Sequence, residues 1–101
     1  MKLSVGDRLI LLGVIPQQGD FTTLKIVRNM RDELSFSEEE HKKLKFRQEG
    51  EMMHWGKGVK SKKIDFGEKA TDIIVDAFKK LNDQKKLRME QMELYERFVG
   101  G

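Results

Sequence analysis

The chain has 101 residues, a formal net charge of +3, no cysteine and a charged fraction of 37%. This length supports one modest hydrophobic core, so we expect a single domain over residues 1–101. The lack of cysteine excludes a disulfide framework and thiolate metal sites. The charge permits a polyanionic partner but does not make the chain a polycation, and the many charged residues predict strongly charged outer faces.

A first helix is predicted from about Val5 to Ile15, because Ser4 and Asp7 can form a variant of the capping box. Its apolar residues cover more than one face of the helix: Val5, Leu9, Ile10, Leu11, Leu12, Val14 and Ile15. Such breadth fits a central core helix, or a second apolar face buried in a homo-oligomer. The apolar run is too short to span a bilayer and no small-residue cleavage site follows it, so we expect a soluble cytoplasmic protein with no membrane partner.

A second helix of about four turns is predicted to end at Leu34. Pro16 ends the first helix, Gly19 gives the turn its freedom and Asp20 is a favourable N-cap. Residues Leu24, Val27, Met30 or Arg31, and Leu34 recur at helical spacing. The segment from Pro16 to Leu34 is therefore a turn followed by an amphipathic helix.

A short third helix is predicted in the segment SEEEHKKL. Ser37 and Glu40 have the spacing of a capping box, and Glu38 to Glu40 lie at the positive end of the helix dipole. The acidic triplet therefore indicates the start of a helix rather than a metal site.

Short strands are predicted next. Gly50 separates KFRQE from EMMHW, which favours a small hairpin, and KKIDF offers a third strand. A glycine-punctuated basic loop, GKGVKSKK, lies between them and contains Lys57, Lys60, Lys62 and Lys63.

Two helices complete the predicted order. The fourth begins near Asp65 or Gly67, carries core positions at helical spacing and breaks at Asn82 and Asp83. These core positions are Ile73, Ile74, Ala77, Phe78 and Leu81. The last helix is expected from about Lys86 to Val99. The fold class is therefore α+β and mostly helical, with three N-terminal helices, a small antiparallel hairpin or three-stranded sheet, and two C-terminal helices.

The sequence favours a non-enzymatic protein without a cofactor. His41 and His54 are too few for a structural zinc site and fit polar surface roles better than catalysis. The serines lie in cap or loop contexts rather than in a nucleophile elbow. GKGVKSKK lacks the length and order of a phosphate-binding P-loop.

Two groups of residues are candidates for binding an anionic ligand. Trp55 precedes the basic loop, where Lys57 and Lys60 could hold phosphate charge beside a stacked base. The alternative is that Trp55 only closes the core under the hairpin.

The second group lies on the second helix. Thr22 and Thr23 offer hydroxyls at the helix start, and Lys25 and Arg28 are neighbours that can share a face. The alternative is that Asp20 occupies the place of an anion, so that capping alone explains this segment.

Three segments carry a resemblance to a known family: LLGVIPQQGDFTTLKIVRNMRDELSFSEEE, KATDIIVDAFKKLND and LYERFV. Together they resemble a widespread family of small proteins encoded by tailed bacteriophages. Phage proteins of this size include oligomeric sponges that sequester the cyclic nucleotide signals of bacterial CBASS immunity. The resemblance implies a protein of the host cytoplasm that binds a cyclic nucleotide between subunits without cleaving it. With such a ligand, Tyr95 would be a second candidate for stacking on a base.

Two other functions remain open. The second and third helices with the hairpin have the element order of a winged-helix module that binds nucleic acid. A phage structural or host-interaction adaptor would instead use the apolar first helix and Val75.

Overall fold

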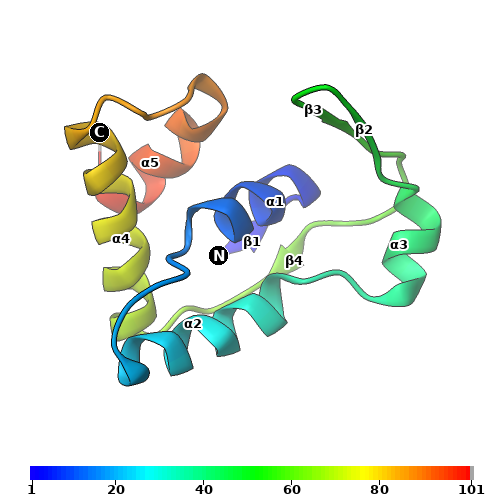
Figure 1. Cartoon of the computed structure of the whole chain (residues 1–101). Helices are drawn as coiled ribbons and strands as arrows, with labels where there is room; N and C mark the ends of the chain where they lie inside the picture. The colour runs from blue at the N-terminus through cyan, green and yellow to red at the C-terminus, as the bar shows by residue number, and fades with distance from the viewer. Residues whose placement is uncertain (101) are drawn as a thin grey trace.

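The computed structural model describes residues 1–100, which form five α-helices, one 3-10 helix and two small antiparallel sheets (Figure 1). In chain order the elements are β1 (Lys2–Leu3), α1 (Val5–Val14), α2 (Phe21–Leu34), α3 (Glu38–Leu44), β2 (Arg47–Glu49), β3 (Met52–His54), β4 (Lys62–Lys63), α4 (Glu68–Asp83), η1 (Met89–Gln91) and α5 (Met92–Val99). The predicted α+β, mostly helical fold class is therefore confirmed. No helix in this part of the chain has the length and apolar character needed to cross a membrane.

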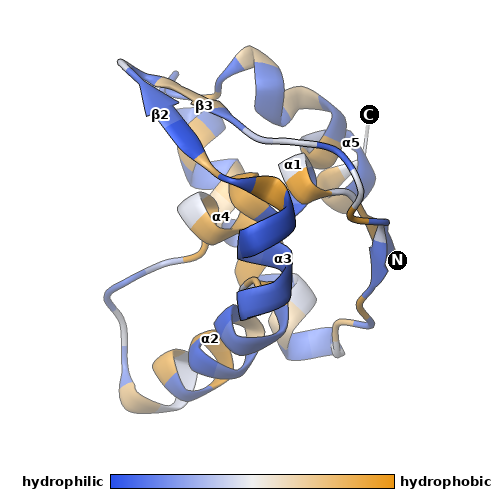
Figure 2. Cartoon of the chain, turned by 90° about the vertical axis from the view of Figure 1, so that its right-hand side faces the viewer, coloured by the Kyte–Doolittle hydropathy of each residue, from blue (hydrophilic) through white to orange (hydrophobic). Residues whose placement is uncertain are grey.

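The hydrophobic core lies between four helices. α1 contacts both α2 and α4, and α5 packs against α4 (Figure 1). Leu11, Leu34, Ile74, Phe78 and Leu94 are almost completely buried in this core. Figure 2 shows α3 and the β2–β3 hairpin as mainly hydrophilic elements outside it. The hairpin is therefore held to the rest of the molecule by few apolar contacts.

α1 is both a core helix and a surface helix. Ser4 and Asp7 form its capping box, with Asp7 N donating to Ser4 Oγ at 3.1 Å and Ser4 N donating to Asp7 Oδ2 at 3.0 Å. Leu11 and Val14 are buried, whereas Leu9 and Ile10 are only half-buried. One apolar face of α1 therefore completes the core, and a second face remains partly open to solvent.

Arg8 of α1 is a charged residue that is completely buried. Its Nε donates to Leu34 O at 3.1 Å and its Nη2 donates to Ser35 O at 2.6 Å, which caps the carbonyl end of α2. The guanidinium also pairs with Glu40 of α3 and lies 4.0 Å from the centre of the Phe36 ring. Arg8 thereby fixes the turn between α2 and α3.

The caps of α2 and α3 are confirmed. Asp20 accepts a hydrogen bond from Thr23 N at 2.7 Å, and this contact lowers the pKa of the Asp20 carboxyl group. Ser37 and Glu40 form the predicted capping box at the start of α3. The acidic triplet is therefore the first turn of a helix.

The strands differ in part from the prediction. β2 and β3 form the expected hairpin around Gly50, with Arg47 opposite His54. The predicted third strand shortens to β4 and pairs with β1, so that Lys2 lies opposite Lys63. Of the two predicted arrangements, the hairpin forms and the three-stranded sheet does not, because β4 pairs with the N-terminal segment in a separate two-stranded sheet.

The last helix begins later than predicted. α4 starts after Gly67, as expected, and ends at Asp83. Lys85, which follows the helix, is in the left-handed conformation at φ 58°. Lys86 N donates to Leu81 O at 2.8 Å, which closes the end of α4. Lys86 therefore lies in the turn that follows α4, and α5 begins only at Met92, after η1.

Candidate functional site

Trp55 follows β3 and is held at the junction of the hairpin, α3 and α1. Gly56 N donates to Leu44 O at 2.7 Å, which ties the end of the hairpin to the end of α3. A Cβ atom added to Gly56 would lie 3.2 Å from Lys43 O, so only glycine fits this approach without movement. On the other side, the indole ring lies against Gly6 of α1. Trp55 is nevertheless 42% exposed, so it does not close the core in the way the sequence also allowed.

A depression of about 400 Å³ lies beside Trp55 and is called here the Trp55 depression. Its lining residues come from the end of α3 and the base of the hairpin: Lys43, Leu44, Lys45, Arg47, His54, Trp55 and Gly56. Lys45 is in the left-handed conformation at φ 47°, which turns the chain from α3 into β2. This turn brings three basic side chains to the same depression as the indole.

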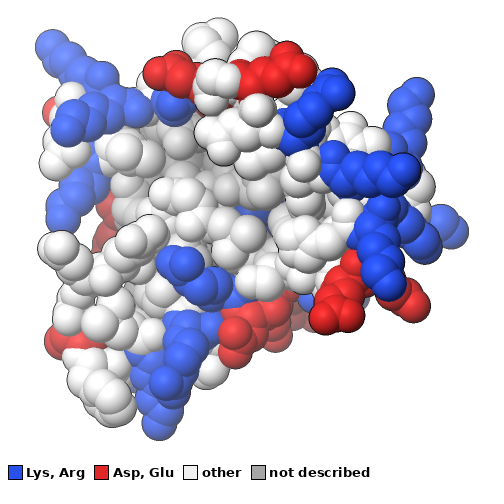
Figure 3. Space-filling view, turned by 45° about the vertical axis from the view of Figure 1, so that its right-hand side comes forward, with Lys and Arg blue, Asp and Glu red and all other residues white. Residues whose placement is uncertain are grey.

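The Trp55 depression is basic. Lys43 and Lys45 form no ion pair with any residue in the range 1–100. Arg47 Nε lies 3.5 Å from Glu49 Oε1, and His54 Nε2 lies 3.7 Å from Glu49 Oε2. Figure 3, in which the side that carries α3 and the hairpin in Figure 1 is turned toward the viewer, shows Lys and Arg side chains at several edges of this face, with Asp and Glu among them. The depression therefore offers positive charge beside an exposed aromatic ring.

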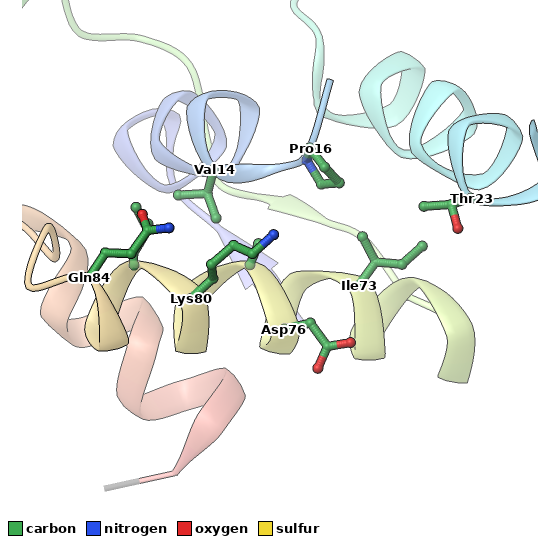
Figure 4. Close-up of a pocket in the computed structure, with 9 residues that line it drawn as sticks. Val14, Pro16, Thr23, Ile73, Asp76, Lys80 and Gln84 are labelled. Atoms are coloured by element: carbon green, nitrogen blue, oxygen red, sulfur yellow. The ribbon is translucent and has the colours of Figure 1, made fainter. Parts of the chain in front are cut away.

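A second depression, of about 380 Å³, lies between the α1–α2 turn and α4 (Figure 4). Its walls are mainly apolar, and the polar residues at its edge include Thr23, Asp76 and Lys80. In Figure 4 the Lys80 side chain extends toward Val14 and Pro16, whereas Asp76 points away from them. This cleft has little positive charge and no aromatic side chain in its lining, so it is a poorer match to a nucleotide.

A third depression, of about 270 Å³, lies on the other side of Pro16. Arg28 and Arg31 contribute its charge, and Leu24 and Val27 contribute apolar surface. It can attract an anion, but no aromatic side chain lines it.

The predicted site residues do not meet in one depression. Of the residues on α2, Thr23 faces the cleft beside α4 and Arg28 lines the depression with Arg31, whereas Thr22 and Lys25 line neither. Pro16 separates the two depressions and belongs to the lining of both. The predicted hydroxyl and basic residues of α2 therefore do not form one binding surface.

The residues predicted around Trp55 are also separated. Lys57 and Lys60 lie on the exposed loop and do not line the Trp55 depression. Tyr95 is half-buried, with its ring edge-on to Phe78 at 6.0 Å between ring centres. Of the eight predicted site residues, only Trp55 lines this depression.

Sequence reasoning missed the basic residues that do lie beside Trp55. The segment KKLKFR contains Lys43, Lys45 and Arg47, but it was divided between the end of a helix and the start of a strand. The useful signal was its density of positive charge close to a hairpin whose second strand ends at the tryptophan.

No group of three or more His, Asp or Glu side chains in the described part of the chain is arranged to hold a metal ion. Comparison with protein family models, curated proteins and solved structures found no match.

Proposed function

We propose that this chain is a non-enzymatic binding protein for a small anionic nucleotide and that the Trp55 depression is its binding site. One observation carries the proposal: a 42% exposed indole lies beside three basic side chains in a depression of about 400 Å³. A nucleotide has the matching chemistry, because its base stacks on an aromatic ring and its phosphate attracts cations.

The three cations have separate roles in the proposal. Lys43 and Lys45, which have no carboxylate partner in the described chain, would bind phosphate charge. Arg47 would bind a phosphate with its planar guanidinium after leaving Glu49, a contact between two exposed side chains that costs little to break. Trp55 would stack on the base.

The resemblance to small phage proteins adds a biological role to this proposal. A cyclic nucleotide immune signal, sequestered in the host cytoplasm by a homo-oligomer, is then the first ligand to test. Two phosphates in one small ligand match a site with more than one basic side chain.

The experiment is a fluorescence titration with cyclic dinucleotides, cyclic trinucleotides and mononucleotides. Trp55 is the only tryptophan, so tryptophan emission reports on binding next to this residue. We expect saturable quenching by at least one cyclic nucleotide and recovery of the ligand intact. Replacing Lys43 and Arg47 together with Gln should weaken binding by a factor of about 10 to 150, from one to two lost charge-assisted contacts.

Lys25→Gln, on α2, is the matched control and should leave the affinity unchanged. Absence of quenching by every nucleotide would overturn the proposal. Cleavage of the ligand would show that the protein is an enzyme and would overturn the proposal of a non-enzymatic binding protein. Binding of single-stranded oligonucleotides alone, with log affinity falling against log salt by about 0.7 per phosphate contact, would favour the nucleic-acid alternative.

A further inference from the structure

A groove of larger volume lies over the outer face of α1, on the other side of Trp55 from the basic depression. Its volume is about 750 Å³. The lining residues come from α1, the tip of the hairpin and the segment around η1: Gly6, Leu9, Ile10, Gly13, Glu51, Met52, Met53, Trp55, Arg88, Glu90 and Gln91. It is called here the α1 groove.

The floor of the α1 groove is one face of α1, which carries Gly6, Leu9, Ile10 and Gly13. Gly6 and Gly13 are seven residues apart on α1, which corresponds to about 10 Å along a helix axis. At its Gly6 end the floor is covered by the indole of Trp55, which lies 3.5 Å from a Cβ atom added to Gly6. A Cβ atom at Gly13 would meet nothing within 4 Å, so the floor is open there, and Leu9 and Ile10 offer half-buried apolar surface between the glycines.

One wall of the groove is apolar and exposed. Met52 is 65% exposed, Met53 is 40% exposed and Trp55 adds its indole. Exposed apolar groups that share one groove are typical of a protein-binding surface. Methionine side chains are flexible and polarizable, so they adapt to the shape of an apolar partner.

The charge of the α1 groove is opposite to that of the Trp55 depression. Glu51 lies on one wall, and Arg88 Nε pairs with Glu90 Oε1 at 2.8 Å on the other. The lining therefore has one unpaired carboxylate and no unpaired cation, on a chain whose net charge is +3. Figure 3 likewise shows a hollow with few charged side chains in the middle of the visible face.

We propose that the α1 groove binds an amphipathic helix of a partner protein. The apolar residues of that helix recur at i, i+3 or i+4, and i+7, so that they contact Leu9, Ile10 and the methionine wall. Basic residues flank the apolar face on the side of Glu51. This site is distinct from the Trp55 depression, and the two share only the indole of Trp55.

The test is selection from a library of displayed helical peptides of about 16 residues, roughly 24 Å long when helical. Selected peptides should have an apolar stripe at helical spacing with Lys or Arg beside it. Affinities are then measured by anisotropy of a labelled peptide. Gly13→Leu fills the floor while remaining compatible with a helix, and it should weaken binding at least about tenfold.

Two further variants make the test specific. Glu51→Lys should weaken a peptide with basic flanks by about two- to fivefold, as expected for an exposed ion pair. Asn29→Leu adds the same side chain to an exposed position of α2 outside the groove and should have no effect. The Lys43→Gln, Arg47→Gln variant should also retain peptide binding, which separates this site from nucleotide binding.

Several outcomes would overturn the proposal: no enrichment of peptides, enrichment without the apolar stripe, or equal binding by Gly13→Leu. Sedimentation of the protein without peptide gives one more outcome that would overturn the proposal. A dimer that Gly13→Leu converts to monomer would show that a second copy of the chain covers the groove.

Discussion

Arg8 and Glu40 form a two-point ion pair at the junction of three helices. Arg8 Nη1 donates to Glu40 Oε2 at 2.8 Å, and Nη2 donates to Oε1 at 3.3 Å. The guanidinium is completely buried, whereas 25% of the Glu40 side chain is exposed. Since Arg8 also donates to the last carbonyls of α2, this pair fixes α1, α2 and α3 relative to one another.

Glu40→Gln should lower the free energy of unfolding by about 2–3 kcal/mol, because it leaves a buried guanidinium without its counter-charge. Glutamine can still complete the capping box with Ser37, so the change isolates the ion pair from the cap. Chemical denaturation measures the effect. Glu39→Gln, at an exposed position in the same turn, is the control and should change stability by less than about 0.5 kcal/mol. Equal losses in both variants would contradict the role of the pair.

Stability should fall between about pH 4.5 and pH 2. The hydrogen bonds from Arg8, followed by that from the Ser37 backbone, lower the pKa of Glu40 from 4.5 to about 2. Because the unfolded chain binds this proton more tightly, the stabilisation is present above pH 4.5 and is lost as the pH falls toward 2. Its size is about 2 kcal/mol after allowing for solvent at the exposed side of the carboxylate.

Denaturation curves at several pH values measure this acid loss. The lowered pKa of Asp20 acts in the same direction in both proteins. The loss should therefore be smaller in Glu40→Gln than in the unaltered chain, and identical pH profiles would refute the assignment to Glu40.

Gly56→Ala should destabilise the chain by about 1–3 kcal/mol, the usual range for overpacking. Its new Cβ would meet two backbone carbonyl oxygens, at 3.2 Å from Lys43 and 3.4 Å from Leu44, which cannot move aside as a side chain would. A shift in Trp55 emission should accompany the loss.

Gly13→Ala is the matched control for Gly56→Ala. It lies in α1 with open space around the new atom, so it should stabilise the chain by about 0.5–1 kcal/mol. Thermal unfolding of the two variants should therefore move in opposite directions.

Double-mutant cycles on nucleotide affinity should identify the cations that share a ligand with Trp55; calorimetric titration measures them, because Trp55→Leu removes the fluorescent reporter. Trp55→Leu and Arg47→Gln should be non-additive, because both residues line one depression. Trp55→Leu and Arg28→Gln should be additive, since Arg28 lines a different one. If Trp55→Leu were non-additive with Arg28→Gln instead of Arg47→Gln, the ligand would contact α2 and the proposed site would be wrong.

The features that sequence predicted well are local. Asp20 and Ser37 cap helices through bonds to residues three positions away, and Gly50 marks a hairpin between neighbouring strands. Each of these depends on a few adjacent residues. The apolar stripes of α2 and α4 likewise follow from helical spacing, so the fold class could be predicted.

The remaining features depend on residues far apart in the chain. Arg8 was not expected in the core, because its acceptors are 26 to 32 residues away. Strands of two residues, such as β1 and β4, are too short to show a periodicity. The neighbours of Trp55 were sought in the following loop, whereas the fold brings Lys43 and Lys45 beside it from the end of α3.

The attachment of the hairpin also has a consequence for exchange kinetics. β2 and β3 lie outside the helical core and are tied to α3 by the bond from Gly56 N to Leu44 O. This unit can open while the four core helices remain folded, so its amides should exchange with solvent well before those of α4. Opening removes a wall from the Trp55 depression and from the α1 groove at once. Any ligand of either site should therefore slow exchange throughout the hairpin, including at amides that it does not touch.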